Sequence, residues 1–187
     1  MKGTIEQNSS RCQWNSHDRG ERDPRYGGVR HRHQTSPLWR KRITLQDITI
    51  RDWFDSWRQL IVDVDYDKAR TMFAPDVVGF GTYMRLVRGI DELENEQWRS
   101  IWGRITEFRF DLDSMVTGTS DDNLTGWGLC LWTSTGYTEN GTPFERPGRS
   151  TVLLNRSDVD QPWQAIHTHL SLVPGTPPRT FGLPPAG

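Results

Sequence analysis

The residue pattern changes near position 105, and this change limits the fold more than any single motif does. Before it, apolar periodicity mainly predicts helices; after it, alternation and apolar runs predict strands joined by turn signals. Helices that precede such a run of strands are typical of an α+β domain with a curved antiparallel sheet. Three helices closing one side of that sheet would form a cone with an internal pocket. The predicted helices are 44–65, 66–73 and 90–104, and the predicted strands are 77–89 (or a hairpin), 106–116, 124–138, 149–158 and 163–173.

The first predicted helix carries the clearest pattern. Its apolar residues recur at spacings of i, i+3, i+4 and i+7, which places them on one face. Thr44, with Asp47 three residues later, resembles a capping box in which Asp replaces the usual Glu. The apolar stripe consists of Ile50, Trp53, Phe54, Trp57, Leu60 and Ile61.

The two ends of the chain differ in composition from its centre. Residues 1–42 contain ten Lys or Arg against four Asp or Glu and few apolar residues, so this basic polar arm cannot bury enough surface to fold alone. It is a solvated tail, an arm that docks on a partner subunit, or a nucleic-acid arm. Residues 175–187 are too rich in Pro and Gly for regular structure. The domain is therefore expected to span 43–174.

The overall composition excludes several classes of protein. The 187 residues carry a formal net charge of −1, so nothing global indicates nucleic acid binding. No apolar stretch approaches the roughly 18 residues of a membrane span, and the N-terminus has no apolar segment typical of a signal peptide. Cys12 and Cys130 are expected to be free thiols, which fits a cytoplasmic protein. No phosphate-binding loop, dinucleotide fingerprint or zinc-finger spacing occurs, so no organic cofactor is expected.

Several segments together resemble a known family. From Thr44 to Pro174 the chain resembles a SnoaL-like domain of the NTF2-like superfamily. The segments that carry the resemblance are "WFDSW", "MFAPDVVGFG", "RGIDELENEQWRSIW", "GTPFERPGRSTVLLNR" and "WQAIHTHLSLVPG". The resemblance implies an NTF2-like cone with the active pocket inside it, and a homodimer formed through the outer sheet face. Because this fold hosts isomerases, cyclases, hydrolases, dehydratases and association domains, it does not by itself imply one activity.

The closing strand also resembles part of another family. In the iota-class carbonic anhydrases it reads "HHHSS" followed shortly by Pro, and His167, His169 and Ser171 match three of those positions. That family also uses a threonine and a tyrosine in its pocket. Thr82 is a candidate for the threonine, whereas Trp98 stands at the expected place of the tyrosine.

Strict alternation along this strand places His167, His169 and Ser171 on one face, together with Trp163 and Ala165. We expect this face to line the pocket, although the reverse orientation would put the histidines outside. Two imidazoles on one face suit metal binding, acid–base work or plain hydrogen bonding. A metal would need a third ligand, and none stands at a recognisable spacing, so no metal is predicted.

Five further residues are candidates for substrate binding. Arg149 would clamp an anionic group, or else form a structural ion pair. Trp57 and Trp98 would wall the pocket or belong to the core, and Thr82 and Tyr83 would supply hydroxyl groups.

These expectations lead to one leading hypothesis and two alternatives. The leading one is an isomerase, cyclase, hydratase or dehydratase that acts on a small molecule, with His169 as the acid–base group, His167 orienting it and Ser171 holding substrate. The alternatives are carbon dioxide hydration and a non-catalytic module for ligand binding or association.

Overall fold

The computed structural model describes residues 45–183, and side chains from residue 50 onward. Two helices open the described chain, α1 (Leu45–Asp63) and α2 (Tyr66–Arg70). The predicted stripe of α1 is buried at Ile50, Trp53, Phe54, Trp57 and Ile61, which confirms the helix and its inward face. Residues 1–42, Cys12 and the cap residue Thr44 lie outside the described residues.

The third predicted helix is one continuous helical segment of mixed type. It consists of α3 (Ile90–Glu92), the π-helix η1 (Leu93–Trp98), α4 (Arg99–Ile101) and the 3-10 turn η2 (Trp102–Arg104). The backbone N–H of Arg99 donates to the carbonyl of Glu94, five residues earlier. Such π segments are often found at functional sites.

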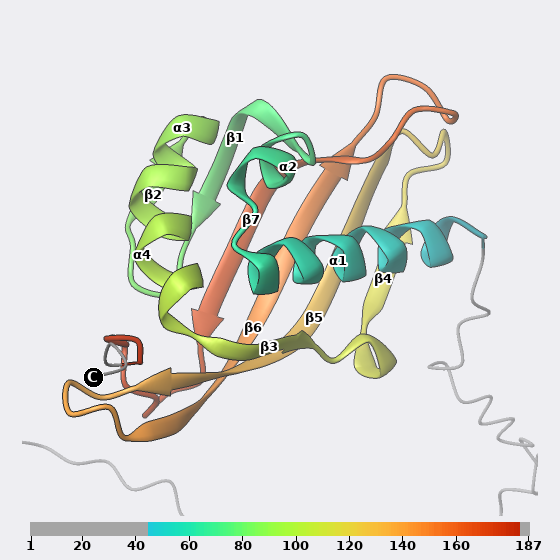
Figure 1. Ribbon diagram of the computed structural model, residues 1–187. Coiled ribbons are helices and arrows are strands. Elements are labelled where there is room, and N and C mark those ends of the chain that lie inside the picture. The colour runs from blue at the N-terminus through green and yellow to red at the C-terminus, as the bar shows by residue number, and fades with distance from the viewer. Residues whose placement is uncertain (1–44, 184–187) are drawn as a thin grey trace, which may run out of the picture. The chain divides into compact units, whose positions relative to one another are not determined.

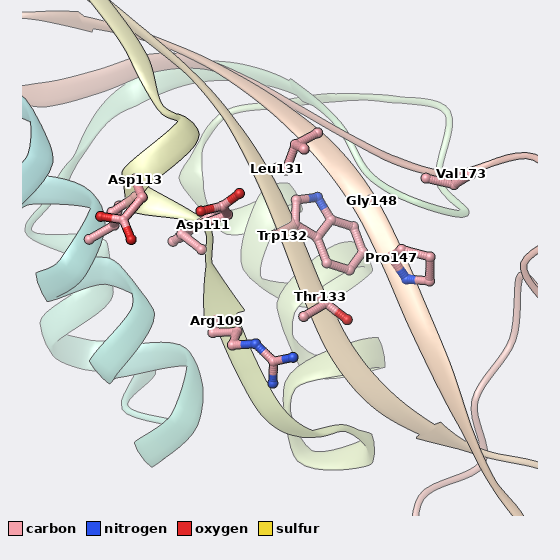
Figure 2. A pocket seen from close by; sticks show the side chains of 11 residues that line it. Arg109, Asp111, Asp113, Leu131, Trp132, Thr133, Pro147, Gly148 and Val173 are labelled. Carbon is pink, nitrogen blue, oxygen red and sulfur yellow. The ribbon is translucent and has the colours of Figure 1, made fainter.

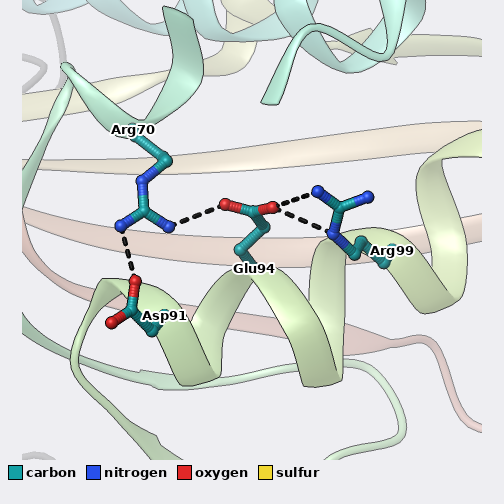
Figure 3. Close-up of polar contacts among 4 residues, drawn as sticks. All are labelled: Arg70, Asp91, Glu94 and Arg99. Atoms are coloured by element: carbon teal, nitrogen blue, oxygen red, sulfur yellow. Dashed lines mark hydrogen bonds and ion pairs between the residues drawn. The ribbon is translucent and has the colours of Figure 1, made fainter. Parts of the chain in front are cut away.

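The buried carboxylate of Glu94 lies on this π segment between two arginines (Figure 3). Its Oε2 accepts from Nη1 of Arg70 at 2.7 Å, and its Oε1 accepts from Nη2 and Nε of Arg99 at 2.5 and 2.9 Å. Arg70 also donates to Asp91 at 2.5 Å. These hydrogen bonds, first of all the one from Arg70, hold the pKa of Glu94 below its ordinary value despite burial.

The strands form one mixed sheet. Its order is β2-β1-β7-β6-β5-β3, with β4 beside β5. All neighbours are antiparallel except β1 and β7, which pair in parallel, so the prediction of a wholly antiparallel sheet is wrong at this one pair. The bounds are β1 Phe73–Phe80, β2 Leu86–Arg88, β3 Thr106–Phe110, β4 Val116–Thr119, β5 Thr125–Tyr137, β6 Pro143–Asn155 and β7 Gln164–Leu172, with a 3-10 turn η3 (Leu112–Ser114) between β3 and β4.

The helices lie on one face of the curved sheet, as the α+β prediction required (Figure 1). Helix α1 crosses the sheet, and its aromatic residues pack on the inward-facing side chains of the strands. The ring of Trp57 lies 5.3 Å from that of Trp53 and 5.5 Å from those of Phe73 and Phe110, between centroids. This aromatic cluster fills much of the cone and leaves only a small space within it.

Two strand predictions differ from the structure. The predicted strand 106–116 ends at Phe110 as β3, and the turn η3 follows it. Strand β6 begins at Pro143 rather than at Arg149, because its first residues pair only with β5; pairing with β7 starts at Gly148. Proline is tolerated where one side of a strand is unpaired. Beyond the strands, part of the Pro/Gly-rich tail is fixed: Oγ1 of Thr180 donates to the carbonyl of Arg104 and accepts from the N–H of Tyr137.

Candidate functional site

The closing strand turns its histidines away from the helices. In β7, Thr168 and Leu170 are buried beneath the helices, whereas His169 is exposed. The expectation that His167, His169 and Ser171 line the pocket is therefore wrong. The reason is a β-bulge: Leu154 pairs with Ala165 but Leu153 pairs with His167, so Ile166 is an extra residue and the alternation reverses.

On the outer face, the predicted catalytic residues make local contacts. His167 donates from Nδ1 to the carbonyl of Val78 at 2.9 Å, and both imidazoles lie beside the ring of Phe80. Ser171 accepts from Nε of Arg149 at 3.4 Å, which places the predicted anion clamp on the outer face as well. Within residues 50–183, no group of three His, Cys, Asp or Glu side chains is arranged to hold a metal ion.

The inner face contains a small cavity between the sheet and the helical segment 90–104. Its volume is about 30 Å³, close to the share of one molecule in liquid water. Two of the predicted substrate-binding residues, Trp57 and Thr82, line it. Among the described residues, the lining is Trp57, Ile61, Thr82, Gln97, Ile101, Trp102, Ile105, Phe108, Trp132, Arg146 and Leu170.

Buried polar atoms without partners are concentrated around this cavity. Nε1 of Trp57, Nε1 of Trp132 and Oε1 of Gln97 are all buried and accept or donate no hydrogen bond among the described residues. The same holds for Nε and Nη2 of Arg146. Each such atom costs about 1–3 kcal/mol if it stays unsatisfied, so a bound water or a ligand in this cavity would supply partners that the described residues do not.

Arg146 is the most unusual member of the lining. It is 1% exposed and projects inward from β6. Burial alone lowers the pKa of its guanidinium to about 10, so the group is still a cation at neutral pH. Ser134 lies opposite it on β5 and has a buried, unpartnered hydroxyl of its own.

Glycines make room for the polar side chains of this cavity. A methyl group at Gly136 would lie 2.4 Å from Cδ of Arg146, and one at Gly81 would lie 2.9 Å from the amide carbon of Gln97. Both distances are shorter than real contacts allow, so these side chains reach the cavity only because Gly136 on β5 and Gly81 just after β1 lack a Cβ.

The remaining predicted residues lie elsewhere. Trp98 belongs to the core, where its ring stacks on that of Trp102 at 4.8 Å. Tyr83 is exposed, and its hydroxyl accepts from Nη2 of Arg179 at 2.6 Å. The sequence analysis missed Arg146, Gln97 and Trp132. For Arg146 one signal was available: it lies an even number of residues before the apolar Val152 and Leu154 of β6, so on a regular strand it shares their face.

The outer face also has an open groove, formed where β3, β5 and β6 lie side by side (Figure 2). Its volume is about 530 Å³, and Arg109, Asp111, Leu131, Thr133 and Pro147 are among the residues that line it. The side chains of Arg109 and Leu131 are exposed to solvent. Trp132 lines both this groove and the inner cavity, whereas Trp57, Gln97 and Arg146 line only the inner cavity.

Comparison with known proteins agrees with the fold. The sequence matches the family described as SnoaL-like domain over residues 50–175. A proposed dehydratase of the NTF2-like family from Streptomyces avermitilis has a TM-score of 0.57 at 14% identity, over 69% of this chain and 97% of that one. An NTF2-like superfamily protein from Salmonella enterica has a TM-score of 0.56 at 16% identity, over 71% and 92%. The association domain of CaMKII from C. elegans has a TM-score of 0.53 at 11% identity, over 67% and 95%.

No curated protein matches the sequence, and identities this low concern the fold alone. The similarity to iota-class carbonic anhydrases finds no support, and its histidines lie outside the cavity. Within the described chain, no helix is long and apolar enough to cross a membrane.

Proposed function

The chain belongs to the SnoaL-like domain family of the NTF2-like superfamily, and we propose that this member binds a small organic molecule inside its cone. The observation that carries the proposal is the set of buried, unpartnered polar atoms around one cavity, on Trp57, Gln97, Trp132 and Arg146. Folding takes these atoms out of contact with water, and a ligand that reaches them would supply the hydrogen bonds that they then lack. In this proposal Trp57 is a pocket wall, and the half-buried Thr82 offers its hydroxyl at the mouth.

Binding fits this cavity better than acid–base catalysis does. The residues that line it include no His, Asp, Glu or Cys, and Arg146, with a pKa of about 10, is a poor proton acceptor at neutral pH. An isomerase or dehydratase reaction would need a base that these side chains do not supply. The residues that line the cavity therefore favour a non-catalytic module that binds a small molecule.

Thr82 and Tyr83, two adjacent residues on the β1–β2 connection, provide a test of ligand binding in the cone. We would measure binding of small neutral and charged fragments by ligand-observed NMR to the wild type, to Thr82→Met and to Tyr83→Met. Because Thr82 lines the cavity and Tyr83 is exposed, Thr82→Met should weaken binding at least tenfold and Tyr83→Met should not. Equal binding to all three proteins would contradict a ligand site in the cone.

The outer sheet face favours a second element of function, the pairing of two copies of this chain. One face of β4, β5 and β6 exposes a continuous series of apolar side chains, which are Val116, Trp127, Leu129, Leu131 and Leu153. Contiguous apolar surface of this kind typically marks an interaction site. One of the solved neighbours is an association domain, and a self-complementary sheet face suits a two-fold homodimer.

This pairing is tested by sedimentation velocity across a micromolar concentration range. Leu131→Asp should convert a dimer to a monomer, because it would bury two unpaired charges in the interface. Val62→Asp is the control, since Val62 is similarly exposed but lies on α1. A wild-type protein that sediments as a monomer throughout would contradict the proposal.

A further inference from the structure

We propose that the ligand of the inner cavity is a small organic monocarboxylate whose charged end pairs with Arg146. This inference rests on the proposed function and gives the chemical class of the ligand for the same site. Three observations carry it: the burial of Arg146, the lack of an anion beside it among residues 50–183, and the size and walls of the cavity.

The first step is the charge. A guanidinium has five donors and cannot act as an acceptor, and burying it without an anion is costly unless something compensates it. Other arginines of the described chain find acceptors: Arg70 and Arg99 donate to Glu94, and Arg156 donates to backbone carbonyls. For Arg146, no ion-pair partner exists among residues 50–183, and no carboxylate lines the cavity.

The second step is the shape of the anion. The planar fork of a guanidinium matches a carboxylate with two parallel hydrogen bonds. The cavity of about 30 Å³ has room for little more than a water-sized group, so only the charged head of a ligand would lie inside it. Trp57 and Trp132 line the same cavity, and their unpartnered indole N–H groups are further neutral donors that suit an acceptor-only group. Oε1 of Gln97 needs a donor, which a water or the body of the ligand would have to supply.

The third step is the body of the ligand. Thr82, Ile101 and Ile105 line the cavity and are each partly exposed, so the space reaches the surface between the β1–β2 connection and the end of the helical segment 90–104. Two of these three rim residues are apolar, and so is Phe108 deeper in the wall. A ligand with its carboxylate at Arg146 would therefore carry a short aliphatic or aromatic body toward this rim.

The position of Arg146 is also fixed by its surroundings. Its Cδ lies over Gly136, where a Cβ would leave only 2.4 Å, and its neighbour across the strands is the small Ser134. The side chain thus rests on the sheet with its head at the cavity. This is the arrangement of a prepared binding site, because the cation is held in place before the anion arrives.

The experiment compares matched anionic and neutral ligands on the full-length protein. Butyrate and benzoate would be titrated against butyramide and benzamide by calorimetry, with sodium chloride as an inorganic anion. The proteins would be the wild type, Arg146→Gln, Arg146→Met and Arg149→Gln. Arg149 lies on the same strand but on the outer face, so its variant controls for net charge and ionic strength.

We expect the wild type and Arg149→Gln to bind at least one carboxylate tenfold or more tightly than its amide, and both Arg146 variants to lose that preference. Equal binding of acid and amide to the wild type, or an unchanged preference in Arg146→Gln and Arg146→Met, would overturn the inference. Chloride that binds as tightly as the carboxylates would also overturn it, since the site would then hold any small anion.

The two proposals fail in different ways. If neutral amides bind as well as acids and Thr82→Met abolishes both, the cavity is a ligand site but not a carboxylate site. If no titrant binds to the wild type, the carboxylate inference fails, and the fragment measurements on Thr82→Met and Tyr83→Met decide the proposed function separately. Arg146→Met guards against misfolding of the Gln variant, because its apolar side chain suits a buried position.

Discussion

Buried charge is handled in opposite ways in two regions of this domain. Around Glu94, one buried carboxylate is held by Arg70 and Arg99, and Arg70 also reaches Asp91 (Figure 3). At Arg146, a buried cation has no anion among the described residues. The first region is complete within the protein and serves stability, whereas the second has no counter-charge among the described residues, and in our proposal a ligand supplies it. On that proposal, the difference marks a position where stability is lower for the sake of binding.

The largest expected effect comes from removing the central charge of the complete region. Glu94→Gln would replace three charge-assisted hydrogen bonds to a buried carboxylate by weaker ones to a neutral amide, and we expect a loss of about 3 kcal/mol in the free energy of unfolding. Urea unfolding at pH 7 measures it, with the exposed Glu96→Gln as the control. A loss no larger than that of the control would mean that the Glu94 region is not held together by charge.

The opposite sign is expected at Arg146. Arg146→Met replaces an uncompensated buried cation by an apolar side chain of similar length, and should stabilise the unliganded protein by about 2 kcal/mol. Arg149→Met, on the exposed outer face, should change the free energy of unfolding by less than about 0.5 kcal/mol. A destabilised Arg146→Met would show that the guanidinium has partners in the folded protein, and the contrast between the two regions would collapse.

A smaller effect is expected from the glycine beneath Arg146. Gly136→Ala places a methyl group against Cδ of that side chain, so it should cost about 1 kcal/mol and weaken carboxylate binding by displacing the guanidinium. Gly103→Ala is the control, because a Cβ there meets nothing within 4 Å. Urea unfolding and calorimetry on the same samples test both parts. Unchanged carboxylate binding in Gly136→Ala would mean that the guanidinium position does not matter.

The fold was more predictable than the site for a physical reason. The stripe of α1 repeats a 3.6-residue period over several turns, so a single irregular residue does not alter its inward face. A strand has a period of two, and the one extra residue at Ile166 reversed the predicted face for every later side chain of β7. Bulges leave no reliable trace in the sequence, and neither does the long-range packing that brings Gln97, Trp132 and Arg146 to one cavity.

The last and smallest effect is a difference in acid sensitivity. The pKa of Glu94 is lower in the folded protein than its ordinary value of 4.5. Its stabilising contribution is therefore full above that value and is lost as the pH falls through the folded-state pKa. Arg146 has its pKa lowered to about 10, so its buried charge destabilises the fold at every pH below about 10 and is relieved only as the pH rises beyond that.

Urea unfolding at pH 7, 5, 4 and 3 should separate these two behaviours. The advantage of the wild type over Glu94→Gln should shrink toward pH 3, because protonation of Glu94 in the wild type does what the substitution does. The gain in Arg146→Met should stay constant over the same range, because the guanidinium remains charged throughout. A gain that instead grew as the pH fell would mean that an acid group of the protein pairs with Arg146 at neutral pH, and the cavity would then need no anion from outside.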